Sequence, residues 1–173
     1  MRLFFGVPIE NSAQNAINKR IEALKDQYNG NYTLMSNMHI TLTFIGEVEP
    51  KVLYMLSDIG DKAFFSFPNF VIKTSDIDSF KDGKVNYLAI ESNEILLELH
   101  NRLNLLLDEA GIVYNSEDIY TPHITLRRGT RIPLHIDMDS MDIEVDRVCL
   151  FESKRVDGIL RYIPLKTWMA EER

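Results

Sequence analysis

The tetrapeptide His-Ile-Thr-Leu occurs twice in this chain, at residues 39–42 and at residues 123–126. Both copies lie in runs of apolar and β-branched residues, which favour strands. Because side chains alternate between the two faces of a strand, the histidine and threonine of each copy share one face, and the isoleucine and leucine share the other. Each half of the chain therefore presents an imidazole and a hydroxyl on an apolar anchor, and we expect two related lobes that face each other across a cleft.

The spacing of apolar residues predicts three helices and several strands. The predicted helices cover residues 12–29, 52–63 and 94–110, and the predicted strands cover residues 3–8, 38–45, 69–78, 84–91, 122–128, 143–153 and 159–167, with a hairpin turn at Lys81-Asp82-Gly83. No linker rich in Pro, Gly or Ser divides the chain. We therefore expect residues 1–173 to form a single α+β domain of two intertwined lobes with one HITL motif each. In this bilobal pseudo-two-fold duplication, antiparallel-rich sheets line a central cleft and helices pack outside.

The 173 residues carry a formal net charge of −7. A surface this acidic is poorly suited to long duplex DNA or to an anionic membrane, both of which need dense basic surfaces. No apolar window approaches the length of a membrane span, and the first residues do not read as a signal peptide. The single cysteine, Cys149, excludes an intrachain disulfide and is typical of a small buried residue. We expect a cytoplasmic protein whose charge still permits a partner with one or two phosphates.

Two histidines are what an in-line displacement at a phosphodiester needs. One imidazole can take a proton from the attacking oxygen while the other gives a proton to the departing oxygen, because imidazole titrates near neutrality. Threonine hydroxyls can donate to the non-bridging oxygens, where negative charge develops. Either histidine alone is more typical of a structural residue, and threonine is a common strand residue. The matched set of His39, Thr41, His123 and Thr125 instead favours a catalytic site.

The other two histidines, His100 and His135, have no partner at the motif spacing, and we interpret both as structural. With four histidines, one cysteine and no HExxH motif, the sequence contains no zinc-binding pattern. The chemistry of two imidazoles also needs no metal, so we expect no cofactor.

Three segments carry a resemblance to a known family: the opening MRLFFGVPI, the run NMHITLTFIGEV and the run YTPHITLRRG. With the doubled HxTx motif, they make the chain similar to the 2H phosphoesterases, and within these to the RNA 2′,3′-cyclic phosphodiesterases, also called the 2′-5′ RNA ligase family. The resemblance covers nearly the whole chain. It implies a bilobal, pseudo-two-fold α+β fold with both motifs in one groove. It also implies metal-independent hydrolysis of a 2′,3′-cyclic phosphate to a 2′-phosphomonoester.

The same resemblance implies roles for the motif residues. His123 would be the base that activates water, and His39 the acid that protonates the departing 3′-oxygen, although the pseudo-symmetry makes an exchange of these roles easy. Thr41 and Thr125 would bind the phosphate.

The family usually has an arginine two residues after the leucine of the second motif, which here is Arg128. Strict strand alternation would instead place Arg127 on the His123 face, so both are candidate phosphate ligands, with Arg128 favoured. The chain departs from the family pattern at residues 33–37, where Trp and Pro are common, and at Tyr87, where a tryptophan is common. These departures bear on nucleobase stacking and substrate size rather than on the chemistry.

The expected partners are RNA 3′ ends or small nucleotides that carry a cyclic phosphate, bound by a monomer. Two other readings remain open. The same chemistry can act on another small cyclic or 2′-5′-linked nucleotide, and the cleft can belong to a non-catalytic module that binds a phosphate or an RNA end.

Overall fold

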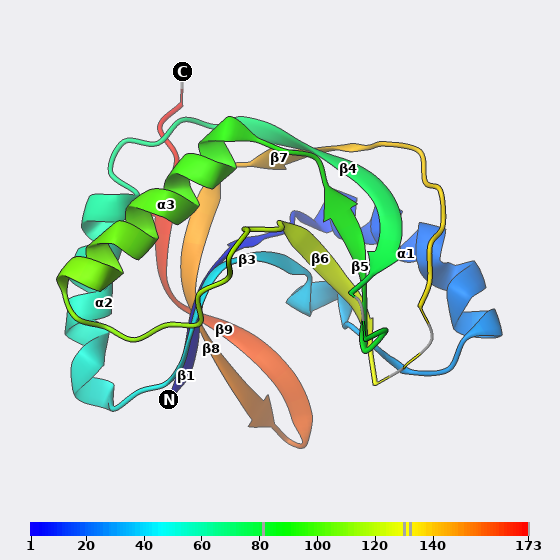
Figure 1. Cartoon of the computed structure of the whole chain (residues 1–173), viewed down its shortest axis with the longest axis horizontal. Coiled ribbons are helices and arrows are strands. Elements are labelled where there is room, and N and C mark those ends of the chain that lie inside the picture. Colours follow the sequence, from blue (N-terminus) through cyan, green and yellow to red (C-terminus); the bar gives the residue numbers. More distant parts are fainter. Residues whose placement is uncertain (81, 130, 132, 173) are drawn as a thin grey trace.

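A computed structural model describes residues 1–80, 82–129, 131 and 133–172 of the chain (Figure 1). The helices are α1 (Asn11–Gln27), α2 (Leu53–Ala63) and α3 (Glu94–Glu109), with 3-10 turns η1 (Met35–Asn37) and η2 (Pro50–Val52). The strands are β1 (Arg2–Pro8), β2 (Asn31–Tyr32), β3 (His39–Glu47), β4 (Phe70–Ser79), β5 (Val85–Ile90), β6 (His123–Arg128), β7 (Asp142–Val145), β8 (Arg147–Val156) and β9 (Ile159–Met169). All three predicted helices are confirmed.

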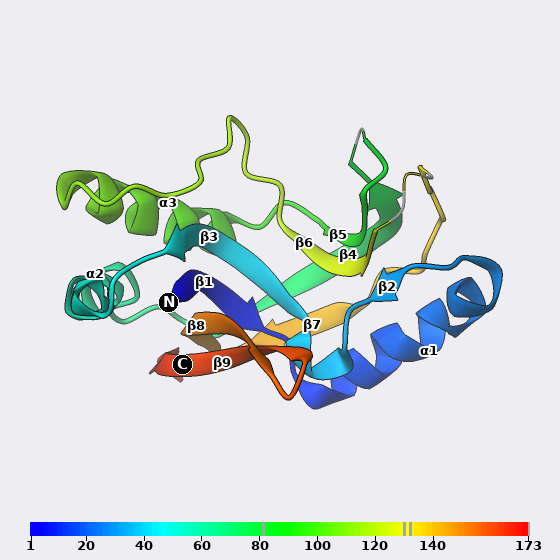
Figure 2. The same ribbon diagram turned by 90° about the horizontal axis from the view of Figure 1, so that it is seen from below.

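The strands of the described residues form one antiparallel sheet in the order β7-β4-β5-β6-β3-β1-β8-β9, and β2 pairs with β6. The sheet curls strongly, since β7 and β8 lie near opposite ends of this order but are separated in the chain by Asp146 alone. Helices α2 and α3 lie together at one end of the molecule, and α1 lies at the other (Figures 1 and 2). The prediction of an α+β fold with an antiparallel-rich sheet is confirmed.

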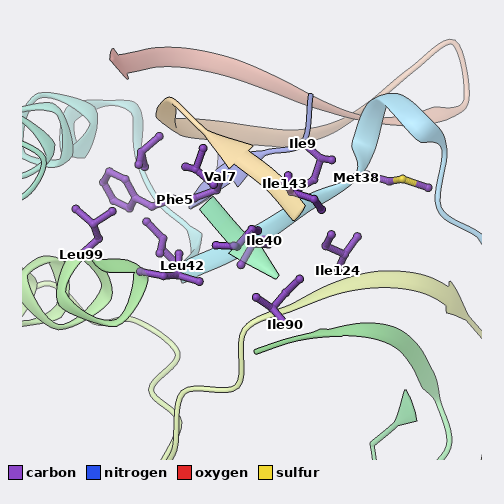
Figure 3. Packing of buried hydrophobic residues seen from close by; sticks show 14 of the residues in the cluster. Phe5, Val7, Ile9, Met38, Ile40, Leu42, Ile90, Leu99, Ile124 and Ile143 are labelled. Atoms are coloured by element: carbon purple, nitrogen blue, oxygen red, sulfur yellow. The ribbon is translucent and has the colours of Figure 1, made fainter. Parts of the chain in front are cut away.

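The apolar residues of the two motifs lie in the main core (Figure 3). Ile40 and Ile124 have no exposed surface, and Leu42 and Leu126 are 2% exposed. They pack among buried side chains from β1 and from the helices, such as Phe5 and Leu99. The core therefore anchors each motif from one face, which leaves its histidine and threonine on the other face.

Strands β3 and β6 meet at one residue pair, Ile40 opposite Ile124. In an antiparallel pair, positions on either side of such a match run in opposite directions. His39 is therefore placed beside Thr125, and Thr41 beside His123. The two copies of the motif are thus related by a local two-fold axis that passes between the isoleucines.

Two short features differ from the sequence-based expectation. The single strand predicted over 143–153 is two strands, because the chain leaves β4 after β7 and pairs with β1 as β8. The exposed Asp146 and Arg147 lie at this change of partner. Strand β2 has only two residues, too few to produce a pattern in the sequence. In the predicted hairpin turn, Lys81 lies outside the described residues, and Gly83 has a φ of 68°.

Two further expectations concern membrane-spanning segments and the single cysteine. None of the helices in the described part of the chain is long and apolar enough to cross a membrane. Cys149 is 3% exposed, its sulfur lies 3.3 Å from Oγ1 of Thr167, and burial raises the pKa of its thiol. This is the environment expected of a small buried residue.

Gly60 allows α2 to approach β9, and its replacement by alanine should destabilise the protein. A β-carbon at Gly60 would overlap the indole ring of Trp168, whose Nε1 donates to Oδ1 of Asp61 at 2.8 Å. Alanine favours helix by about 1 kcal/mol over glycine. We nevertheless expect Gly60→Ala to lower the free energy of unfolding by about 1–3 kcal/mol, because the added methyl group would overpack the contact with Trp168. Denaturant unfolding measures this, with the exposed α1 variant Asn15→Ala as control; a stabilised Gly60→Ala would contradict the prediction.

Candidate active site

His39, Thr41, His123 and Thr125 project from one face of the β3–β6 pair, and each is partly exposed. Within the register set by Ile40 and Ile124, the two histidines are diagonal neighbours, whose backbones lie about 7–8 Å apart on an antiparallel pair. The structure therefore brings together the two imidazoles and two hydroxyls that the sequence singled out.

Both imidazoles are held in the same way. Nδ1 of His39 lies 2.7 Å from the carbonyl oxygen of Asn37, and Nδ1 of His123 lies 2.7 Å from that of Thr121. A carbonyl only accepts, so Nδ1 carries the proton and donates in each ring. Nε2 is then the nitrogen that gains or loses a proton, as acid–base catalysis requires. In His39, Nε2 lies 3.0 Å from Oγ1 of Thr41, whose hydroxyl can donate to it.

His39 lies in an aromatic surrounding. The rings of Phe4, Tyr162 and Phe151 lie 4.8, 5.0 and 6.3 Å from its own ring. Burial among these rings lowers the pKa of His39 to about 4, and the positive charges of His123 and Arg128 act in the same direction. His39 is therefore neutral at neutral pH when the site holds no anion.

His123 has a different set of neighbours. The rings of Phe80 and Tyr87 both lie 5.1 Å from its ring, and these two rings lie 4.5 Å from each other. Burial lowers the pKa of His123, while the carboxylate of Glu117 raises it. The two motif histidines are thus equivalent in the sheet but differ in their electrostatic environment.

A bulge in β6 decides which arginine faces the histidines. Asn86 of β5 pairs with Arg127 and Tyr87 pairs with Thr125, so Leu126 is an extra residue in β6. Leu126 and Arg127 consequently both lie on the buried face, each 2% exposed. Arg128 returns to the other face, where its charge lowers the pKa of both His39 and His123.

Strict alternation, which would place Arg127 beside His123, therefore fails at this bulge. The Arg127 guanidinium donates from Nε to Oδ1 of Asn86 at 2.8 Å and from Nη1 to the carbonyl of Asn29 at 3.0 Å, and it lies 5.2 Å from the ring of Tyr28. Its contacts anchor β6 to the end of α1 rather than supply a charge to the cleft. Arg128 remains the candidate phosphate ligand.

Comparison with known proteins shows which family the chain belongs to. Residues 13–157 match the model of the 2′-5′ RNA ligase superfamily. The chain belongs to this superfamily. An RNA 2′,3′-cyclic phosphodiesterase of Thermotoga maritima is 26% identical over 164 residues, which cover 88% of this chain and 87% of that protein. Another of that name from Escherichia coli is 28% identical over 135 residues, 76% of this chain and 75% of that protein.

Solved structures of the superfamily share the fold. The crystal structure of E. coli LigT in apo form matches with a TM-score of 0.81 and 25% identity, over 98% of this chain and 96% of LigT. Its complex with 3′-AMP matches with a TM-score of 0.79 and 26% identity, over 98% and 97% of the two chains. The resemblance inferred from the motifs is confirmed at the level of the superfamily.

The segment before the first motif contributes a residue that the sequence did not indicate. Asn37 is 6% exposed, its Nδ2 donates to the carbonyl of Leu160 at 2.8 Å, and its Oδ1 accepts from the N–H of Tyr162 at 3.3 Å. Its own carbonyl holds His39. Asn37 therefore links the β8–β9 hairpin to the imidazole ring of His39. In the sequence, the only sign of this role was an amide side chain two residues before the motif. The partners of that side chain lie more than 120 residues further along the chain, where no local pattern connects them to it.

His135, which lies outside both motifs, is exposed, and its imidazole nitrogens lie 3.1 Å from Asp137, 3.4 Å from Asp78 and 3.9 Å from Asp76. Asp76, His135 and Asp137 are close enough to share an ion, but exposed acidic groups often occur without one. None of the four motif side chains belongs to this group. Asp137 and Asp78 raise the pKa of His135 above its ordinary value of 6.5.

The three environments predict different titration midpoints, which imidazole ¹⁵N NMR can measure. In the free protein we expect His39 to stay neutral down to a pH of about 4 and His123 to titrate below 6.5. His135 should titrate above 6.5 and serves as the internal control. Inorganic phosphate should raise the midpoint of His39, because an anion favours the charged ring. A His39 midpoint at or above 6.5 without phosphate would contradict the burial argument.

Proposed function

We propose that this protein hydrolyses 2′,3′-cyclic phosphate ends of RNA or nucleotides to 2′-phosphomonoesters by two-histidine acid–base catalysis that needs no metal. The observation that carries the proposal is the antiparallel match of the two HITL strands, which brings His39 and His123 to one face as diagonal neighbours, each with its Nδ1 bound to a backbone carbonyl and its Nε2 left for proton transfer. The activity named for the T. maritima and E. coli relatives supports the same reaction.

The proposed chemistry uses the paired motif groups in the roles that the family resemblance implies. His123 takes a proton from water as the water oxygen bonds to phosphorus, and the bond from phosphorus to O3′ breaks. His39 gives a proton to O3′, so the product is a 2′-phosphomonoester with a free 3′-hydroxyl. The hydroxyls of Thr41 and Thr125 donate to the non-bridging oxygens, and the charge of Arg128 offsets the negative charge that develops there.

The acid role of His39 depends on the substrate. With a pKa of about 4, the ring is neutral in the empty site. A phosphodiester anion held between the rings favours the protonated form and raises this pKa. The bound phosphate therefore supplies the charge that allows His39 to enter the reaction as an acid.

The substrate we propose is a single phosphate at an RNA end or on a small nucleotide. LigT has been crystallised with 3′-AMP, which supports a nucleotide-sized ligand in this fold. Here the side of the cleft at His123 carries Phe80 and Tyr87, against which a base can stack. Comparing rates on a cyclic mononucleotide, an RNA oligonucleotide and a 2′-5′-linked dinucleotide would separate these substrates. We also propose that the protein is a cytoplasmic monomer. Its affinity for such ends should depend only weakly on salt, because it contacts a single phosphate.

The test is an assay on an oligoribonucleotide with a 2′,3′-cyclic phosphate end in the presence of EDTA. We expect conversion to the 2′-phosphate at an unchanged rate when EDTA is added. A 3′-phosphate product would contradict the assignment of the departing oxygen. Tight binding of cyclic phosphates without turnover would instead favour a non-catalytic binding module.

A further inference from the structure

The 84-residue offset of the two motifs extends to the segments that precede them. Asn31 pairs with Arg128 at the end of β6. Asn115, which is 84 residues further on, forms the equivalent pair with Phe44 of β3, and its N–H donates to the Phe44 carbonyl at 2.9 Å. The two halves of the site therefore begin with the same backbone pairing.

The halves then diverge. In the first, the N–H of Thr33 donates to the carbonyl of Leu126 at 2.9 Å, so backbone pairing closes the space beside β6. The residue equivalent to Thr33 is Glu117, and the carbonyl equivalent to that of Leu126 belongs to Leu42. That carbonyl accepts instead from Nδ1 of His100 at 2.8 Å, a side chain of α3. The segment that links α3 to β6 (Figure 2) thus gives up the second backbone pairing beside β3.

Aromatic side chains keep this second space open. The hydroxyl of Tyr120 donates to the carbonyl of Thr41 at 2.8 Å, and the rings of His100 and Tyr120 stack with centroids 3.9 Å apart and planes 8° apart. Asn104 lies 3.3 Å from Nε2 of His100 and accepts a hydrogen bond from Thr43. Side chains rather than backbone therefore satisfy the carbonyls of β3 here.

The result is a chamber of about 50 Å³ on the Thr41 and His123 side of the cleft. Its polar lining includes Thr41, Thr43, His100, Glu117, Tyr120 and His123. Nucleotide sites take roughly 300 Å³ or more, whereas one water needs only about 10–15 Å³ of such space and two or more polar partners. The chamber suits water, and it is open to solvent at the exposed Glu117.

We propose that this chamber is the nucleophile site, in which Glu117 holds the attacking water against His123. The proposal rests on the phosphodiesterase function proposed above. One O–H of the water donates to the Glu117 carboxylate, and the other donates to Nε2 of His123, which takes that proton as the oxygen bonds to phosphorus and the bond to O3′ breaks. Because the backbone bond from Thr33 to Leu126 occupies the equivalent position in the first half of the site, the proposal makes His123 the base and His39 the acid.

The charges around His123 agree with this role. His39 faces it from β3, Tyr87 from β5, Arg128 from β6 and Glu117 from the segment before β6. Of these, the carboxylate raises the pKa of His123, against the effect of burial. Removing the carboxylate should lower that pKa, which moves the rising limb of the kcat profile, the profile of the substrate complex, to lower pH.

The experiment compares Glu117→Leu with Asp118→Leu, since Asp118 is an adjacent exposed acid outside the chamber. We expect Glu117→Leu to lower kcat for cyclic phosphate hydrolysis about tenfold or more with KM unchanged, and to shift the limb as above. Methanol gives a second readout. Water has one O–H for His123 and one for Glu117, but methanol has only one, so Glu117 should select against methanol. The share of 2′-methyl phosphate product in mixed solvent should therefore rise several-fold in Glu117→Leu only.

The outcomes separate the two proposals. If wild type does not turn over cyclic phosphates, the phosphodiesterase function fails. If wild type does, and Glu117→Leu matches Asp118→Leu in kcat, pH profile and methanol share, the chamber is not the nucleophile site while the proposed function stands.

Discussion

His39→Ala and His123→Ala should each reduce kcat for 2′,3′-cyclic phosphate hydrolysis by about 10³-fold or more. General acid and general base each contribute about 10²–10⁴-fold when a positioned side chain supplies them. The two Nε2 atoms are the only proton-transfer groups that the paired HITL strands bring to the cleft face within the described residues. The measurement is a single-turnover assay on a cyclic-phosphate oligonucleotide in EDTA. The matched control is His135→Ala, which removes an exposed imidazole outside both motifs and should keep wild-type activity.

The pH profile adds a check that a loss of fold cannot imitate. Wild type should show a bell-shaped pH profile of kcat, because in the substrate complex one imidazole must be neutral and the other charged. Residual activity in each alanine variant should lose one limb of the bell: the rising limb without the base, the falling limb without the acid. Circular dichroism establishes that both variants fold. Unchanged turnover in either folded variant would refute two-histidine catalysis.

Arg128→Met and Arg127→Met should affect different properties of the protein. Arg128 is exposed on the histidine face, so we expect its loss to lower kcat/KM by about 10²-fold with little change in stability. Arg127 is buried and bonded to Asn86 and Asn29, so its loss should lower the free energy of unfolding by about 2–3 kcal/mol. Steady-state kinetics and urea unfolding on both variants measure the two effects.

The contrast tests the bulge in β6 directly. If β6 alternated strictly, Arg127 would face the phosphate and the kinetic loss would follow Arg127→Met. Equal kinetic losses for both variants, with equal stability, would mean that the bulge does not hold in solution. Lysine variants refine the result, since Arg128→Lys keeps the charge but loses the planar, bidentate donor set.

Local pattern predicted the elements of this fold well where they are long and periodic. The leucines of α3 and the alternation of β3 have periods that only one secondary structure satisfies. The short strand β2 and the change of partner at Asp146 were missed, because two residues carry no period and a strand-like run does not reveal which strand each of its parts pairs with. Pairing depends on residues far along the chain, which a local window does not contain.

The sequence predicted the repeated residues of the candidate site but not the residues around them. Repetition of a four-residue motif indicated His39 and His123 without any structure. Asn37 and Glu117 carried no such signal, because neither belongs to the repeat. The side-chain partners of Asn37 lie more than 120 residues along the chain, and the role proposed for Glu117 depends on a space between elements. The choice between the arginines also required the structure, since a bulge adds one residue and exchanges the faces after it.

By itself, then, the sequence determined the chemical groups of the site: two imidazoles and two hydroxyls, each pair on one face of a strand, with apolar anchors behind them. These follow from the two-residue period of a strand and need no knowledge of the rest of the chain. Tertiary structure alone decided how the two copies meet at Ile40 and Ile124, which arginine accompanies them, and why the halves are unequal. The reason is physical: the pKa of His39 and the chamber beside His123 depend on which rings and carboxylates pack around each copy, and folding brings those groups from distant parts of the chain.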